Sequence, residues 1–186
     1  MLIKEISPVP VPVTTPLSIR LAAPADATSI AKVHIASWQA AYRDLLSPTY
    51  LLALGNTVQR RATFIESALA NGRLDAWVAE RDSEIVGWSS FGSSRDDDAP
   101  PLTGELYSLY LHPQVWGQGG GRLLWQASRQ ALVASGHCQV TLWALDGNQR
   151  AERFYVAAGF IRQTTRPRVF EDDGIALPLI RYVQAL

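Results

Sequence analysis

The stretch HPQVWGQGGGRLLW, residues 112–125, places four glycines between a strand-like run and a helix-like run. TGELYSLYL (residues 103–111) precedes it with the composition of a strand, and RLLWQASRQALVAS (residues 122–135) has apolar residues at helical spacing. Gly117 and Gly119 permit a positive φ, and the first amides of a helix have no partner within it. A bare backbone at a helix start binds anions, so the stretch predicts a phosphate-binding turn.

Three classes of phosphate-binding turn could explain this stretch. A nucleoside-triphosphate loop ends in Gly-Lys-Ser/Thr, and the sequence here has Gly-Gly-Arg, so that class is excluded. A dinucleotide turn fits better, because Gly117 and Gly119 have its first spacing and Asp146 closes the next predicted strand. Its third glycine is replaced by Arg122. The third class binds the pyrophosphate of coenzyme A.

Two motifs support the third class. QVWGQG has the pattern Gln/Arg-x-x-Gly-x-Gly/Ala at Gln114, Gly117 and Gly119. NQRAERFYVAAGF has a second pattern at Asn148, Ala151, Phe154, Tyr155, Gly159 and Phe160. On these motifs the chain resembles the GNAT superfamily of acyl-CoA-dependent N-acyltransferases, over about residues 18–184. It departs from the family at Trp116, where many members carry arginine, so backbone amides and Arg122 are expected to bind more of the phosphate.

The pattern of apolar residues and turns predicts one domain, residues 18–186, after a proline-rich tail, residues 1–17, with Pro8, Pro10, Pro12 and Pro16. The order is β-α-α-β-β-β-α-β-α-β-β. This is an α+β (mixed α/β) fold, in which a central, mostly antiparallel sheet is flanked by about four helices, and it agrees with the GNAT fold. Strands are expected at residues 18–22, 75–80, 85–92, 103–111, 138–145, 160–165 and 177–185, and helices at 24–46, 56–70, 122–135 and 148–160.

The resemblance implies transfer of an acetyl group from acetyl-CoA to an amine by direct attack, with no covalent enzyme intermediate and no metal. A backbone N–H within residues 109–111 would hold the oxyanion, Tyr155 would act as general acid, and Asn148 would contact the pantetheine arm. Tyr155 and Asn148 could instead be a core tyrosine and a helix cap. The residues expected to bind coenzyme A are Leu109, Tyr110, Leu111, Gln114, Val115, Trp116, Gly117, Gln118, Gly119, Gly120, Gly121, Arg122, Asn148, Ala151 and Tyr155.

Glu105 is the candidate catalytic base. It has the parity of Leu109 and Leu111 along its strand, which predicts that all three share a face. A carboxylate on a partly buried face is costly unless it is hydrogen-bonded or used in chemistry. Some family members use a glutamate here through a water molecule, and a salt bridge at the strand end is the alternative.

The first predicted helix carries His34, Trp38 and Tyr42 at intervals of four, which puts them on one stripe. Such a stripe is either core or a wall of the acceptor pocket, which the resemblance implies for this helix. Trp38, Tyr42 and Glu105 are therefore candidate substrate contacts.

The composition bears on nucleic-acid binding, membrane binding and cellular location. Seventeen basic and 17 acidic residues give zero net charge, which removes the simplest argument for nucleic-acid or membrane binding. The single cysteine, Cys138, is expected in the core, and with no evident signal peptide a cytoplasmic location is expected. The three aspartates at residues 96–98 are expected in a solvated loop.

The acceptor stays open, as a small-molecule or peptide amine, because protein N-termini, lysines, polyamines, aminoglycosides and amino acids are all acetylated on this scaffold. A homodimer is compatible with the family. The alternative function is a non-catalytic acyl-CoA-binding or sensing module.

Overall fold

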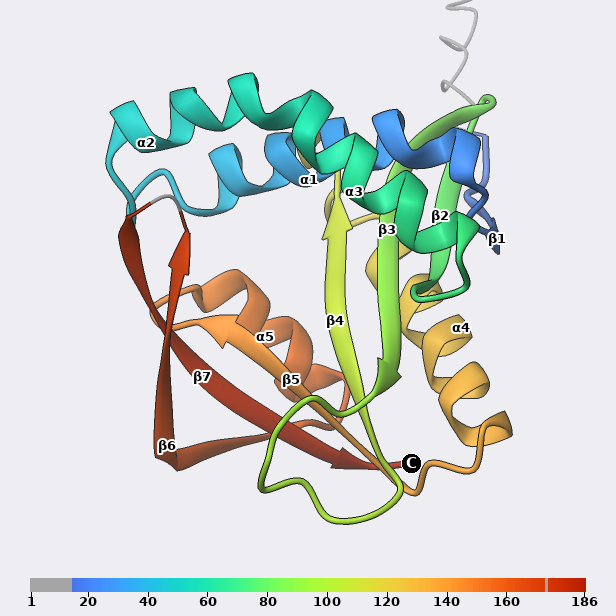
Figure 1. Cartoon of the computed structure of the whole chain (residues 1–186), viewed down its shortest axis with the longest axis vertical. Helices are drawn as coiled ribbons and strands as arrows, with labels where there is room; N and C mark the ends of the chain where they lie inside the picture. Colours follow the sequence, from blue (N-terminus) through green and yellow to red (C-terminus); the bar gives the residue numbers. More distant parts are fainter. Residues whose placement is uncertain (1–14, 173) are drawn as a thin grey trace, which may run out of the picture.

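The computed structural model describes residues 15–172 and 174–186, without the side chains of residues 164–167. The elements follow in the predicted order, with one added short helix, α2 (Figure 1). They are β1 (Ser18–Leu21), α1 (Ala27–Ala41), α2 (Pro48–Ala53), α3 (Val58–Ala70), β2 (Asp75–Arg81), β3 (Glu84–Ser93), β4 (Thr103–Leu111), α4 (Gly120–Ala134), β5 (Gln139–Leu145), α5 (Gln149–Ala157), β6 (Ile161–Asp172) and β7 (Ile175–Ala185).

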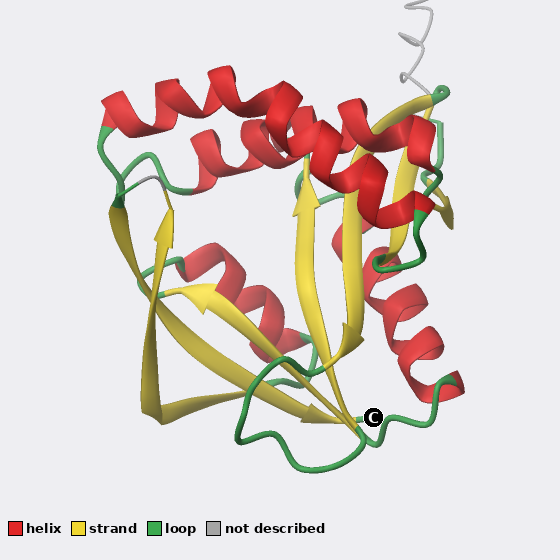
Figure 2. Cartoon of the chain, in the orientation of Figure 1, coloured by secondary structure: helices red, strands yellow, loops and turns green. Residues whose placement is uncertain are grey.

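The strands form one sheet in the order β1-β2-β3-β4-β5-β7-β6. The pairing is antiparallel throughout except between β4 and β5, which are parallel. The predicted fold class, a mixed and mostly antiparallel sheet with flanking helices, is confirmed (Figure 2).

The helices cover both faces of the sheet. Along β2, Val78 packs in a core cluster with residues of α1 and α3, whereas its neighbour Trp77 packs against a second cluster that contains Trp125 of α4 and Tyr155 of α5. Because successive side chains of a strand point to opposite faces, α1 and α3 lie on one face and α4 and α5 on the other.

The first predicted helix, residues 24–46, is shorter in the structure. A 3-10 turn at Pro24–Asp26 precedes α1, which ends at Ala41. A new helix, α2, then begins at Pro48, because the Ser47 side chain caps it by accepting a hydrogen bond from the amide of Tyr50.

β4 and β5 stay together for only a short distance. They pair at residues 103–105 of β4 and 139–141 of β5, and beyond these residues no further pairing joins them. Figure 1 shows the two strands starting side by side and then separating. β5 remains in the sheet because its other edge pairs with β7 along its whole length. The separation leaves an opening in the middle of the sheet.

A β-bulge in β4 changes which side chains share a face. Ser90 of β3 pairs with Ser108, but the next residue, Phe91, pairs with Leu106, so Tyr107 is an extra residue in β4. The alternation of side chains is interrupted there. The prediction that Glu105 shares a face with Leu109 and Leu111 was therefore wrong.

Three further expectations can be compared with the structure. Pro8, Pro10 and Pro12 of the predicted tail lie outside the described residues. Cys138 is exposed and not in the core, because it lies in the turn before β5. Among the described residues, no helix has the length and apolar character needed to cross a membrane.

Candidate functional site

Two cavities meet where β4 and β5 separate. The smaller has a volume of about 440 Å³ and lies along the glycine turn and α5. The larger has a volume of about 880 Å³ and lies beneath α1 and α3. Five residues line both cavities and so mark the junction, which is the point where two bound molecules could meet: Tyr42, Tyr107, Ser108, Tyr110 and Trp143.

The glycine turn meets two separate physical requirements. Gly117 and Gly119 have φ values of 75° and 87°, which other residues rarely adopt. Gly120 leaves room for Leu111, because a Cβ there would lie 2.5 Å from its Cδ2 and the leucine side chain would have to shift. Within the described chain, the amides of Gly117, Gln118 and Gly119 make no hydrogen bond. Together with the unpaired first amides of α4, they form an anion-binding backbone.

Trp116 supports a positive charge although it carries none. Its indole Nε1 donates to the carbonyl of Leu111 at 2.8 Å, which fixes the ring against the end of β4. The guanidinium of Arg150, from α5, lies over that ring at 4.3 Å from the centroid. Arg150, Arg122 and Arg153 all line the smaller cavity. The sequence analysis missed Arg150 and Arg153, because nothing local connects α5 with the turn.

Most of the predicted cofactor-binding residues line the smaller cavity. They are Leu109, Tyr110, Leu111, Val115, Trp116, Gly117, Gly119, Gly120, Gly121, Arg122, Asn148, Ala151 and Tyr155. Gln114 and Gln118 are not among the lining residues. Instead, Gln118 accepts a hydrogen bond from Arg81 at 2.7 Å and donates one to the carbonyl of Gln114 at 3.0 Å, which braces the turn from outside.

The separated edge of β4 presents backbone groups to the opening. The amide of His112 donates to the carbonyl of Val86 on β3, and Tyr110 pairs with Trp88. Because backbone groups alternate along a strand, the amides of Leu109 and Leu111 face the opposite way, toward the opening. The amide of Tyr110 faces β3, and Tyr110 contributes its side chain to the junction instead.

α5 brings Asn148 and Tyr155 to the smaller cavity. Asn148 Oδ1 accepts a hydrogen bond from the amide of Ala151 at 3.2 Å and so caps the helix, while its side chain also interacts with the Tyr42 hydroxyl. Burial, together with Tyr110 and Tyr182, raises the pKa of Tyr155 above its ordinary value. Its hydroxyl therefore stays protonated at neutral pH and can act as a hydrogen-bond donor.

The aromatic stripe of α1 lines the larger cavity. His34 stacks on Tyr110 with ring centroids 4.4 Å apart, Trp38 lies beside it, and Tyr42 follows directly after the helix. Burial, aided by the positive charge of Arg61, lowers the pKa of His34 to about 3. His34 is therefore neutral at physiological pH.

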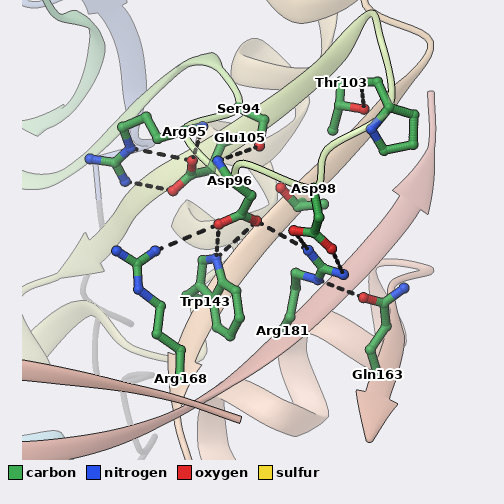
Figure 3. Close-up of polar contacts among 12 residues, drawn as sticks. Ser94, Arg95, Asp96, Asp98, Thr103, Glu105, Trp143, Gln163, Arg168 and Arg181 are labelled. Atoms are coloured by element: carbon green, nitrogen blue, oxygen red, sulfur yellow. Dashed lines mark hydrogen bonds and ion pairs between the residues drawn. The ribbon is translucent and has the colours of Figure 1, made fainter. Parts of the chain in front are cut away.

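Glu105 lies on the wall of the larger cavity and is only 2% exposed. Arg95 holds it with three hydrogen bonds, from the backbone amide at 2.9 Å, from Nε at 3.3 Å and from Nη2 at 2.5 Å (Figure 3). The guanidinium of Arg95 also stacks over Tyr107 at 3.9 Å from the ring centroid. The structure thus contains the salt bridge that the sequence analysis gave as the alternative.

Asp96 has a structural role that the sequence analysis missed. Its side chain is 4% exposed, and both carboxylate oxygens accept from Nε1 of Trp143, at 3.0 and 3.1 Å. Arg168 and Arg181 lie beside the same carboxylate (Figure 3). The prediction of a solvated loop was therefore wrong for Asp96, although Asp97 is exposed. Asp96 fixes Trp143 at the junction of the two cavities.

Asp172, at the end of β6, joins the β6–β7 hairpin to the helices. Its carboxylate accepts a hydrogen bond from the hydroxyl of Tyr50 on α2 and lies 3.3 Å from Nη2 of Arg61 on α3. Arg61 and Asp172 both line the larger cavity. In the described part of the chain, no group of three or more His, Cys, Asp or Glu side chains could hold a metal ion.

Comparisons with known proteins agree with this geometry. Among solved structures, the GCN5-related N-acetyltransferase from Rhodopseudomonas palustris matches with a TM-score of 0.73 at 21% identity, covering 94% of this chain and 98% of that one. The PaiA N-acetyltransferase from Thermoplasma acidophilum, solved in complex with coenzyme A, matches with a TM-score of 0.68 at 18% identity, covering 89% and 98%. These likenesses support the fold.

Sequence comparison identifies the family. The uncharacterized N-acetyltransferase YuaI of Bacillus subtilis is 28% identical over 133 residues, which is 71% of this chain and 73% of the relative. The family model described as "Acetyltransferase (GNAT) family" matches residues 38–160, which include the junction, the glycine turn and α5. The chain therefore belongs to the GNAT family of acetyltransferases.

Proposed function

We propose that this protein transfers an acetyl group from acetyl-CoA to an amine by direct attack of the amine on the thioester. The observation that carries the proposal is the meeting of two cavities at the opening between β4 and β5. The smaller cavity fits coenzyme A, because it combines unpaired amides and three arginines at one end with apolar walls along β4 and α5. The structurally similar PaiA protein was solved with coenzyme A. The acceptor amine would approach from the larger cavity.

Backbone amides on the exposed edge of β4 can stabilise the negative charge that develops on the thioester oxygen. Attack on the thioester carbonyl places negative charge on its oxygen, and a preorganised N–H donor stabilises that charge. The amides of Leu109 and Leu111 face the opening, so either can donate to this oxygen. The side chains of Tyr42, Tyr110 and Trp143 line both cavities and would lie beside the reacting atoms.

We assign the acceptance of the amine proton to Glu105. A carboxylate has about four lone-pair sites, and Arg95 occupies three of them in the structure. One site is left for a water molecule that relays the proton from the amine.

Tyr155 is assigned to the leaving group, the sulfur of coenzyme A. The amine loses a proton as the amide bond forms, and the departing sulfur gains one as the carbon–sulfur bond breaks. The raised pKa of Tyr155 makes it a poor source of a whole proton for a thiolate. We therefore assign it a hydrogen bond that stabilises the departing sulfur until a proton arrives from the solvent.

The proposed activity is tested by incubating the protein with acetyl-CoA and a panel of amines while free thiol is followed. The expected result is thiol release that depends on the amine, with the N-acetylated amine detected by mass spectrometry. Tight binding of coenzyme A without turnover of any amine would instead support a non-catalytic acyl-CoA-binding module. A protein that binds neither acetyl-CoA nor coenzyme A would contradict the proposal entirely.

Replacement of Tyr155 by Phe removes the hydroxyl and keeps the ring in its aromatic cluster. We expect kcat to fall roughly tenfold to a hundredfold, as for the loss of a hydrogen bond to a charged group, while the dissociation constant of coenzyme A stays nearly unchanged. Tyr182→Phe is the matched control, because Tyr182 packs against Tyr155 but does not line the smaller cavity. An unaltered kcat in Tyr155→Phe, with chemistry shown to limit the rate, would refute the role of the hydroxyl.

Replacement of Arg150 by Ala tests whether Trp116 holds the phosphate-binding charge. Because the variant loses a hydrogen bond to a charged phosphate, we expect the Kd of coenzyme A to increase roughly tenfold, as measured by calorimetry. Trp116→Ala should weaken binding similarly, and the double variant should lose little more, because the two side chains act as one unit. Pantetheine lacks the nucleotide phosphates, so its affinity should not change. Equal losses for pantetheine and coenzyme A would argue against a phosphate contact.

A further inference from the structure

The larger cavity carries an excess of positive charge. Among the described residues, two carboxylates line it, those of Glu105 and Asp172, whereas five arginines do: Arg60, Arg61, Arg73, Arg95 and Arg168. His34, which also lines the cavity, adds no charge because its pKa is low. The whole chain has no net charge, so this excess is a local property of the cavity.

The two carboxylates of the wall are already paired. Glu105 is held by Arg95, and Asp172 lies against Arg61. The surplus of positive charge therefore depends on Arg73 and Arg168. The guanidinium of Arg73 donates a hydrogen bond to the neutral hydroxyl of Ser67, at 3.3 Å. Arg168 lies 3.6 Å from Asp96, which Arg181 also contacts at 3.4 Å in addition to its closer partner Asp98 at 2.9 Å.

The uncharged part of the wall combines aliphatic residues with a group of aromatic ones. His34, Trp88 and Tyr110 form one packed group, and Phe64 and Phe170 line the cavity although they are 72% and 45% exposed. Nε1 of Trp88 and Nε2 of His34 are buried and have no hydrogen-bond partner among the described residues. An indole N–H is only a donor, so an acceptor oxygen on a ligand would satisfy it.

We propose that the acceptor is a small amine that also carries an anionic group, a carboxylate or a phosphate, attached to an apolar or aromatic body. Arginine binds such groups through paired hydrogen bonds, and the cavity volume is in the range of small-molecule sites. Polyamines and aminoglycosides carry several positive charges, and the same arginines would repel them. This inference rests on the proposed function, since it identifies the second substrate of the same site.

The inference is tested with pairs of amines that differ only in the anionic group. Phenylalanine is compared with phenethylamine, tryptophan with tryptamine, and O-phosphoserine with serine, and spermidine represents the cationic class. Binding to the protein saturated with coenzyme A is measured by calorimetry, and kcat/KM is measured with acetyl-CoA. We expect at least one anionic member to bind and react at least tenfold better than its partner. The carboxylate and phosphate pairs distinguish the two sources of the anion.

Charge-reversal variants connect the preference to the wall. For each amine pair, we divide kcat/KM of the anionic member by kcat/KM of the neutral member. In Arg73→Glu or Arg168→Glu, this ratio should fall at least tenfold. Arg43→Glu is the control, because Arg43 is exposed and lines neither cavity. The thermal unfolding of each variant is measured to confirm that it is folded.

The possible failures are distinguishable. A panel in which no anionic member binds better than its partner, including one in which neither binds, overturns the acceptor class. The same holds if spermidine is preferred, or if both charge reversals leave the ratio unchanged. Failure of the proposed function is a separate result, namely preferential binding of the anionic amines without any release of thiol.

Discussion

The pairing of β4 with β5 over only three residues of each strand is the constraint on which the rest of the site depends. A sheet that stayed closed would satisfy the inner edges of both strands and leave no room between them. Here β7 holds β5 along its other edge, so β5 can turn away without leaving the sheet. The unpaired amides of β4 would be costly in a dry interior. Facing a cavity, they are available to a ligand.

The bulge at Tyr107 and the buried carboxylate of Asp96 then determine which side chains face each of the two cavities at the opening. The bulge assigns Glu105 to the larger cavity and Leu109 and Leu111 to the smaller one, although they are close in sequence. Asp96 fixes the indole of Trp143 between them. The arginines are divided in the same way: Arg122, Arg150 and Arg153 line the smaller cavity, whereas Arg61, Arg73 and Arg168 are among those that line the larger one.

Local signals predicted much of this fold and part of the site. The glycines and the helical spacing after them indicated the turn at α4, and the second motif placed Tyr155 and Asn148 on α5. Nothing in the sequence indicated the bulge, because the pattern TGELYSLYL is that of an ordinary alternating strand. Asp96 appeared solvated, since the groups that bury it, Trp143 and Arg181, are distant in sequence. Arg150 was missed for the same reason, although its guanidinium lies over the ring of Trp116, at the position where an arginine is absent.

The most direct test of the account is a crystal structure of the protein with coenzyme A. We expect the pyrophosphate against the amides of residues 117–122 and Arg150, and the sulfur at the junction, beside the hydroxyl of Tyr155 and the open edge of β4. The larger cavity should remain free for the acceptor. Coenzyme A bound in the larger cavity, or with its phosphates away from the glycine turn, would contradict the assignment of the two cavities.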